Sequence, residues 1–190
     1  MAKNLFLALW PGAGQRLALS RLQDQLPPQA GRRSTHPEDI HLTLVFLGPA
    51  TLEQRQCVEA AAGRVRGLPF ELILDRLGSF PRARVLWCGT EFAPPALSDL
   101  VLALRAELAG CGFALDNRPY RPHATLARKA PTLEARTLEI PIRWRVDSFV
   151  LACGQEGPPP RYRVLRRWYL EGTRRIDPWR HDDANPLCDT

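Results

Sequence analysis

A string of the form His-x-Thr-Leu occurs twice in the sequence. It reads HLTL from His41 and HATL from His123, with the two histidines 82 positions apart. An imidazole titrates near neutral pH, so one histidine can hold a proton while another lacks one. Two such groups are the minimum for general acid–base catalysis: one takes a proton from the attacking water and the other protonates the leaving oxygen.

Both strings lie in predicted strands, where side chains alternate between two faces. His41 and Thr43 therefore share one face, and His123 and Thr125 do the same. The aliphatic residues between them occupy the other face, and Phe46, which has their parity, is predicted to lie in the core. If two such strands faced each other, the histidines could act on opposite sides of a phosphorus atom while the hydroxyls held its non-bridging oxygens.

The pattern alone leaves other interpretations open. His41 and His123 could be ordinary hydrogen-bonded strand histidines. No carboxylate and no third histidine or cysteine joins either string, so we expect no metal site and no cofactor. A zinc hydrolase that uses both histidines and a cysteine is the less favoured alternative.

The segments between the strings predict a mixed α+β protein, because helices and strands do not follow a strict βαβ order. A capping box of Thr51 and Gln54 is expected to open the second helix. The tail from about residue 173 is polar and broken by prolines, and we expect it to be mobile. Hydrophobic periodicity predicts helices at 15–25, 51–66 and 95–108 and strands at 4–10, 40–47, 70–74, 84–88, 123–127, 143–153 and 163–170, the last two as a hairpin.

The sequence around both strings resembles the 2H phosphoesterase superfamily, whose signature is the doubled His-x-Thr string. The segments at 39–48 (DIHLTLVFLG), 118–128 (RPYRPHATLAR) and 161–170 (RYRVLRRWYL) are similar to its RNA 2′,3′-cyclic phosphodiesterase branch, long called 2′-5′ RNA ligase. The resemblance covers about residues 4–170. It implies one bilobal domain over residues 1–172, with two antiparallel sheets flanked by helices around a central cleft.

The resemblance also implies a role for each residue of the motif. His41 would be the proton donor to the leaving oxygen, and His123 would be the base that activates water. Thr43 and Thr125 would bind the substrate phosphate. Arg128 matches an arginine of similar sequences and either binds that phosphate as well or lies in solvent. Strict alternation places it on the core face, so the strand must end or twist before it. The implied reaction opens an RNA 2′,3′-cyclic phosphate to a 2′-phosphate without a metal, with weak 2′-5′ RNA ligation in reverse.

The charge balance permits a nucleic-acid partner. The chain of 190 residues has a net charge of +6, and 24 of its 26 basic residues are arginine, which makes planar bidentate contacts with phosphate. We expect RNA with a 2′,3′-cyclic phosphate end, tRNA fragments included, as the partner, although charge alone does not identify one. We expect no membrane contact, because the apolar segment at 1–10 is too short to span a bilayer, and we expect a monomer.

The cysteines predict neither a disulfide framework nor a structural zinc site. Their number is odd and no CxxC pair occurs, which favours a reducing cytoplasm as the location. The five positions are Cys57, Cys88, Cys111, Cys153 and Cys188.

Several other side chains have two interpretations. Tyr120 and Tyr162 either stack on a base or ribose of RNA or pack against the protein. The arginines at 161, 163 and 167 would share one face of a strand, where they either follow an RNA backbone or lie in solvent.

Three hypotheses about function follow from the sequence. The first is hydrolysis of RNA 2′,3′-cyclic phosphates. The second keeps the fold and chemistry but changes the substrate to 2′-5′ linked oligonucleotides or a small cyclic nucleotide phosphate such as ADP-ribose 1″,2″-cyclic phosphate. The third is a non-catalytic RNA-binding module, which would not need both histidines and both threonines as a matched set.

Overall fold

The computed structural model describes residues 4–26, 31–116 and 118–171, so the predicted mobile tail lies outside the described residues. None of the helices in this part of the chain is long and apolar enough to span a membrane. The elements are β1 (Asn4–Leu9), α1 (Ala13–Asp24), β2 (Arg33–Ser34), η1 (Pro37–Asp39), β3 (Leu42–Pro49), α2 (Leu52–Arg64), β4 (Phe70–Phe80), β5 (Val85–Gly89), α3 (Pro95–Leu108), η2 (Ala109–Cys111), β6 (His123–Arg128), β7 (Arg136–Val146), β8 (Ser148–Gly154) and β9 (Tyr162–Tyr169).

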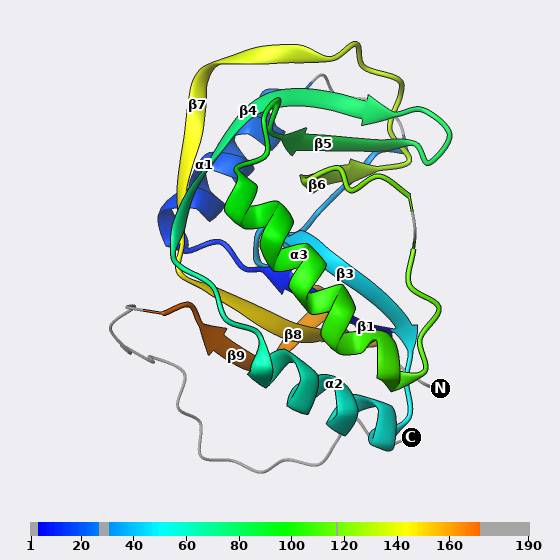
Figure 1. The fold of residues 1–190 in the computed structure, drawn as a ribbon. Helices are drawn as coiled ribbons and strands as arrows, with labels where there is room; N and C mark the ends of the chain where they lie inside the picture. Colours follow the sequence, from blue (N-terminus) through cyan, green and yellow to red (C-terminus); the bar gives the residue numbers. More distant parts are fainter. Residues whose placement is uncertain (1–3, 27–30, 117, 172–190) are drawn as a thin grey trace.

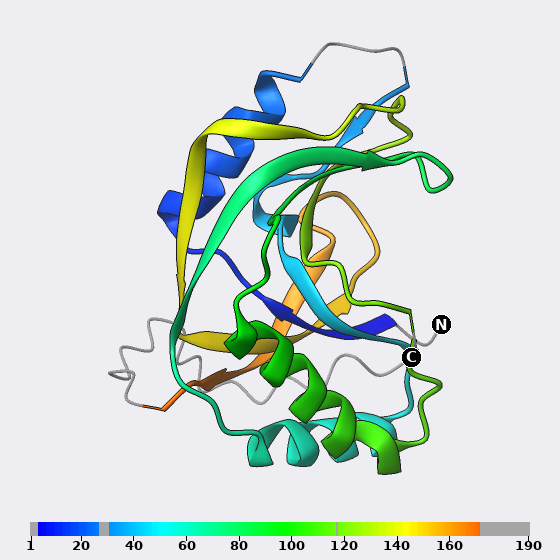
Figure 2. The ribbon, with the colours of Figure 1, turned by 45° about the horizontal axis from the view of Figure 1, so that its top comes forward.

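Within the described residues the strands form one nine-stranded sheet in the order β7-β4-β5-β6-β3-β1-β8-β9, with β2 paired to β6 (Figures 1 and 2). All pairings are antiparallel, which confirms the α+β class. The sheet has two halves, β7-β4-β5-β6 and β3-β1-β8-β9, joined where Leu42 lies opposite Ala124. The two expected sheets are thus the halves of one continuous sheet.

One hydrophobic core joins the sheet to the helices. Helix α1 contacts β6 and β7, while α3 contacts β3 and α2 contacts β9. Leu42 and Leu126 are fully buried in the cluster that contains the apolar side chains of all three helices. Burying each leucine side chain contributes about 1.5–3 kcal/mol. A slip of one residue would expose them, so this core fixes the register of the strands that carry both strings.

The helix starts follow from local signals. Helix α2 opens with the predicted capping box, in which the Thr51 hydroxyl accepts the Gln54 N–H and the Gln54 side chain accepts the Thr51 N–H. Helix α3 has Pro95 at its first position, where a missing N–H costs nothing. The three predicted helices are confirmed within a few residues of their ends.

Bulges change which side chains face the core. The pairing of β1 with β3 shifts register twice, and as a result Phe46 lies opposite Phe6. Phe46 is 57% exposed. The prediction that it belongs to the core is wrong, because strict alternation does not continue across a bulge.

The segment predicted as one strand at 143–153 is two strands. The chain passes at Asp147 from β7, which pairs with β4, to β8, which pairs with β1 and β9. The prediction of one strand is therefore wrong, whereas the hairpin of β8 and β9 is confirmed. The start of β7 escaped prediction because most of its residues before Trp144 are exposed on both faces, so no alternation marks it.

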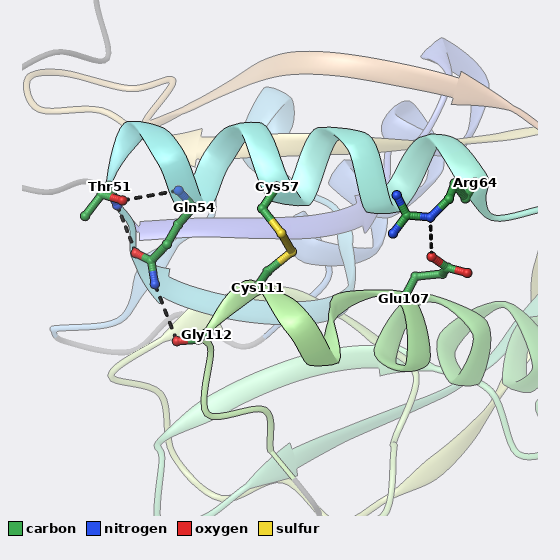
Figure 3. Close-up of a disulfide and its surroundings, with 7 residues drawn as sticks. All are labelled: Thr51, Gln54, Cys57, Arg64, Glu107, Cys111 and Gly112. Carbon is green, nitrogen blue, oxygen red and sulfur yellow. Dashed lines mark hydrogen bonds and ion pairs between the residues drawn. A yellow bond between two sulfur atoms is a disulfide. The ribbon is translucent and has the colours of Figure 1, made fainter.

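A disulfide links α2 to the short helix η2 that follows α3. Cys57 in α2 is bonded to Cys111 in η2, directly after α3 (Figure 3). The prediction of no disulfide is wrong, because the cysteine count cannot reveal two residues that helix packing brings to a Cα–Cα distance of 5.7 Å. Beside the bond, Arg64 of α2 pairs with Glu107 of α3 at 2.6 Å.

Candidate active site

The two His-x-Thr strings meet at the junction between the two halves of the sheet. Strands β3 and β6 pair at the residues that follow the two histidines. Continuing this antiparallel register by one residue in each direction sets His41 beside Thr125 and Thr43 beside His123. All four side chains are partly buried, and they alternate with fully buried residues of the core. The structure therefore brings all four together on the face that is turned away from the core.

Both histidine rings are held in the same way. Nδ1 of His41 lies 2.6 Å from the carbonyl oxygen of Asp39, and Nδ1 of His123 lies 2.7 Å from that of Arg121. A carbonyl oxygen only accepts hydrogen bonds, so Nδ1 carries a hydrogen in each ring. Each histidine therefore gains and loses its second proton at Nε2, the atom through which it can act as acid or base.

Aromatic side chains surround His41. The rings of Phe6 and Trp10 stack on its imidazole at centroid distances of 4.7 and 5.3 Å, and the Tyr162 ring meets it edge-on at 5.1 Å. Burial lowers the pKa of His41 to about 4, against the opposing effect of its bond to the Asp39 carbonyl. In the free protein His41 is therefore neutral at pH 7.

His123 has a simpler environment. Its ring is in edge-on contact with Phe80 at 4.9 Å. Burial lowers the pKa of His123, and the bond to the Arg121 carbonyl opposes the shift. The positive charge of Arg128 lowers the pKa of both histidines, so it lies within electrostatic reach of each.

A bulge in β6 decides the position of Arg128. The pairing of β6 with β5 shifts by one residue between Thr125 and Ala127. Leu126 and Ala127 are both buried in the core, and Arg128 after them is exposed. The bulge thus returns Arg128 to the side of the histidines, which strict alternation would not do.

Comparisons with known proteins identify the family. A family model described as the 2′-5′ RNA ligase superfamily matches residues 11–157. The chain belongs to the 2′-5′ RNA ligase superfamily. It is 39% identical over 148 residues to the RNA 2′,3′-cyclic phosphodiesterase of Escherichia coli, across 76% of this chain and 82% of that protein. It is 32% identical over 181 residues to the protein of the same name from Thermus thermophilus, across 89% of this chain and 91% of that one.

A solved structure agrees with the family assignment. The crystal structure of E. coli LigT complexed with 3′-AMP superposes with a TM-score of 0.83 at 31% identity, covering 90% of this chain and 99% of that one. The resemblance to the 2H phosphoesterases is thereby confirmed.

The sequence patterns did not predict the residues that surround His41 in this protein. It predicts Phe6 and Trp10 only as parts of one buried strand, and it indicates no role for Asp39. A usable signal was present, because residues 6, 8 and 10 alternate and so share one face with each other. The two tyrosines also differ: Tyr162 contacts His41, whereas Tyr120 is largely buried and donates its hydroxyl to the Thr43 carbonyl at 3.0 Å.

The arginines of β9 do not share a face. The pairing of β9 with β8 shifts by one residue between Val164 and Arg166. Arg166 pairs with Glu59 of α2 at 3.1 Å, and Arg167 donates to the Ser148 hydroxyl at 3.0 Å. The prediction that the arginines at 161, 163 and 167 line one face is wrong, because this bulge inverts the alternation.

The buried carboxylate of Asp39 holds the start of β9 against His41. It accepts the backbone N–H of Arg161 at 2.8 and 2.9 Å and that of Tyr162 at 3.0 Å. Asp39→Ala should lower the free energy of unfolding by about 1–3 kcal/mol for each donor left unsatisfied, as measured by urea denaturation. The exposed Asp24→Ala is the control and should change it by less than about 0.5 kcal/mol. Equal stabilities of the two variants would refute this role of Asp39.

Proposed function

We propose that this chain hydrolyses RNA 2′,3′-cyclic phosphate ends to 2′-phosphate ends, with His41 as proton donor and His123 as proton acceptor. The observation that supports this most is the meeting of two histidines, each with Nδ1 bonded to a carbonyl, and two threonines on one face of the sheet junction. The relatives from E. coli and T. thermophilus are named RNA 2′,3′-cyclic phosphodiesterase, and we extend that activity to this chain.

The proposed reaction has one displacement at phosphorus. Water attacks the phosphorus atom, and its proton passes to Nε2 of His123 as the new P–O bond forms. The bond between phosphorus and the 3′-oxygen breaks, and that oxygen takes the proton from Nε2 of His41. The product has a 2′-phosphate and a free 3′-hydroxyl, and the histidines exchange protons with solvent before the next cycle.

The other proposed site residues stabilise charge. The hydroxyls of Thr43 and Thr125 would donate to the non-bridging oxygens, and the guanidinium of Arg128 would lie beside them. The bound phosphate is negative and favours the protonated form of a nearby imidazole. The substrate itself would therefore raise the pKa of His41 from about 4 and allow it to act as the donor.

The pH–rate profile should be bell-shaped. Activity needs one histidine to be protonated and the other to be neutral, so kcat/KM falls when both are protonated and when both are neutral. The pKa of His41 is lowered to about 4 and that of His123 is also lowered, so the maximum should lie below about pH 6.5, the ordinary value for histidine. The kcat profile should lie at higher pH, because the bound anion raises both pKa values.

A substitution at Arg128 should shift the pH profile. Arg128→Gln removes a positive charge that lowers the pKa of both histidines, so both limbs of its bell should move to higher pH. A kcat/KM that stays flat between about pH 5 and 8 is incompatible with the two-histidine mechanism.

The function itself is tested by product analysis. Among the described residues no group of three His, Cys, Asp or Glu side chains is placed to hold a metal ion, and the assay includes EDTA to test whether turnover needs one. We expect a nucleoside 2′,3′-cyclic monophosphate to give only the 2′-phosphate. Absence of turnover on this nucleotide and on a short RNA with the same end would refute the proposal.

The natural partner and setting belong to the same proposal. We propose RNA that ends in a 2′,3′-cyclic phosphate, tRNA fragments included, acted on by a monomer, with weak 2′-5′ ligation as the reverse reaction. The cytoplasm is the proposed location, and the Cys57–Cys111 bond would have to resist the reductants of that compartment. The net charge of +6 is compatible with such a partner. Sedimentation of the purified chain tests the monomer, and sequencing of RNA ends that accumulate without it tests the substrate.

A further inference from the structure

Four cations gather where β6 ends. Arg128 lies opposite Arg33 of β2 on one side and opposite Val85 of β5 on the other. Arg84 directly precedes Val85, and its guanidinium reaches the carbonyl of Lys129 at 3.4 Å. All four basic side chains are exposed. We call the three that lie beyond Arg128, namely Arg33, Arg84 and Lys129, the basic track.

Within the part of the chain that the structure describes, no carboxylate forms an ion pair with a cation of this cluster. The ion pairs found among the described residues involve arginines 55, 64, 66, 76, 118, 143 and 166, and none involves the basic track or Arg128. Arg33 and Arg128 are direct cross-strand neighbours, and like charges in that position repel. An anion between them would remove this repulsion, so the arrangement suits a negatively charged ligand.

Arg128 connects the candidate active site with Arg33, its cross-strand neighbour in the basic track. Arg128 lies three positions after Thr125 in the same strand, and its charge reaches both histidines. A 2′,3′-cyclic phosphate is the 3′ end of an RNA, so the rest of the chain continues only on its 5′ side. The preceding nucleotides each add a phosphate, and Arg33 lies next to Arg128, which is proposed to bind the terminal phosphate.

We propose that Arg33, Arg84 and Lys129 bind the backbone phosphates of the nucleotides that precede the cyclic end. This inference rests on the proposed function and adds to it the residues that hold the part of the RNA chain before the cyclic end. The contacts are electrostatic and independent of sequence, so they raise the affinity for any RNA end and weaken as salt is added.

The test compares an RNA with a mononucleotide. The variant R33Q/R84Q/K129Q removes the track and leaves Arg128 in place. Its Kd is measured by fluorescence anisotropy for a short RNA that ends in a 2′-phosphate, at about 50 and about 200 mM salt. The logarithm of the binding constant falls linearly with the logarithm of the salt concentration. Loss of three contacts with single-stranded RNA should make this slope less steep by about 2, and it should reduce the affinity at the lower salt by about tenfold or more. Turnover of a nucleoside 2′,3′-cyclic monophosphate should change less than about twofold, which also shows that the variant is folded.

A matched control separates the effect of the basic track on RNA affinity from the effect of the net charge. The variant R21Q/R64Q/R66Q removes the same charge from the region of α1 and α2, which pack on the core face. An equal loss of RNA affinity in both variants, or an unchanged salt slope in the track variant, would overturn the proposal that the basic track binds RNA. A parallel loss of mononucleotide turnover would also overturn it, since the residues would then act on the cyclic end. Failure of the wild type to hydrolyse any cyclic substrate would instead refute the proposed function.

Discussion

His123→Ala is expected to lower the turnover of a nucleoside 2′,3′-cyclic phosphate by about 10²–10⁴-fold, the usual contribution of a positioned general base. The ring of His123 is held by the Arg121 carbonyl at 2.7 Å, which leaves Nε2 to take the proton from water. Alanine removes that acceptor, and water must then attack without a base. Turnover is measured under single-turnover conditions, so that product release does not mask the loss.

The same loss is expected for His41→Ala, and the double variant should be little slower than either single variant, because groups that act in one step are not additive. His36→Ala is the control. His36 caps η1 by accepting the Glu38 N–H through Nδ1 at 3.3 Å, and we assign it no part in the reaction. A His123→Ala enzyme that keeps more than about a tenth of wild-type turnover, below the usual contribution of a general base, would show that it is not the base.

The second large effect concerns stability. Removal of the disulfide with the variant C57S/C111S should lower the free energy of unfolding by about 4 kcal/mol, because the bond closes a long loop in the unfolded chain. Cys57 and Cys111 are 54 residues apart, and the bond joins two helices that pack on the core. Urea denaturation of the wild type and of the variant measures the difference.

Reduction supplies the control for the disulfide. Dithiothreitol should destabilise the wild type by the same amount and leave the serine variant unchanged. Turnover by the folded variant should stay close to that of the wild type, because α2 and α3 lie on the face opposite the histidines. If the wild type is as stable with the reductant as without it, the two thiols are not bonded in the protein.

The sequence predicted which side chains of each string share a face, because the physical basis of that prediction is local. Alternation along a strand places each histidine with its threonine, and the leucines that follow them fix the buried face. The capping box of α2 and the proline at the start of α3 are local signals in the same sense. The catalytic candidates could therefore be named from the order of residues alone.

Bulges and long-range packing account for what the sequence could not predict. One-residue shifts between strands moved Phe46 out of the core, brought Arg128 to the histidine side and separated Arg167 from its neighbours. Such shifts depend on the partner strand and leave no mark in the alternation of a single strand. The Cys57–Cys111 bond likewise depends on two helices that meet only in the folded chain.

The division of roles between the histidines is the central claim, and a change of leaving group tests it most directly. In a substrate whose 3′-oxygen is replaced by sulfur, the leaving thiolate needs no protonation, because a thiol has a pKa near 8.5, far below that of an alcohol. The account predicts that His41→Ala hydrolyses this substrate nearly as fast as the wild type does, whereas His123→Ala remains at least about 10²-fold slower. Equal rescue of both variants, or rescue of His123→Ala alone, would contradict it.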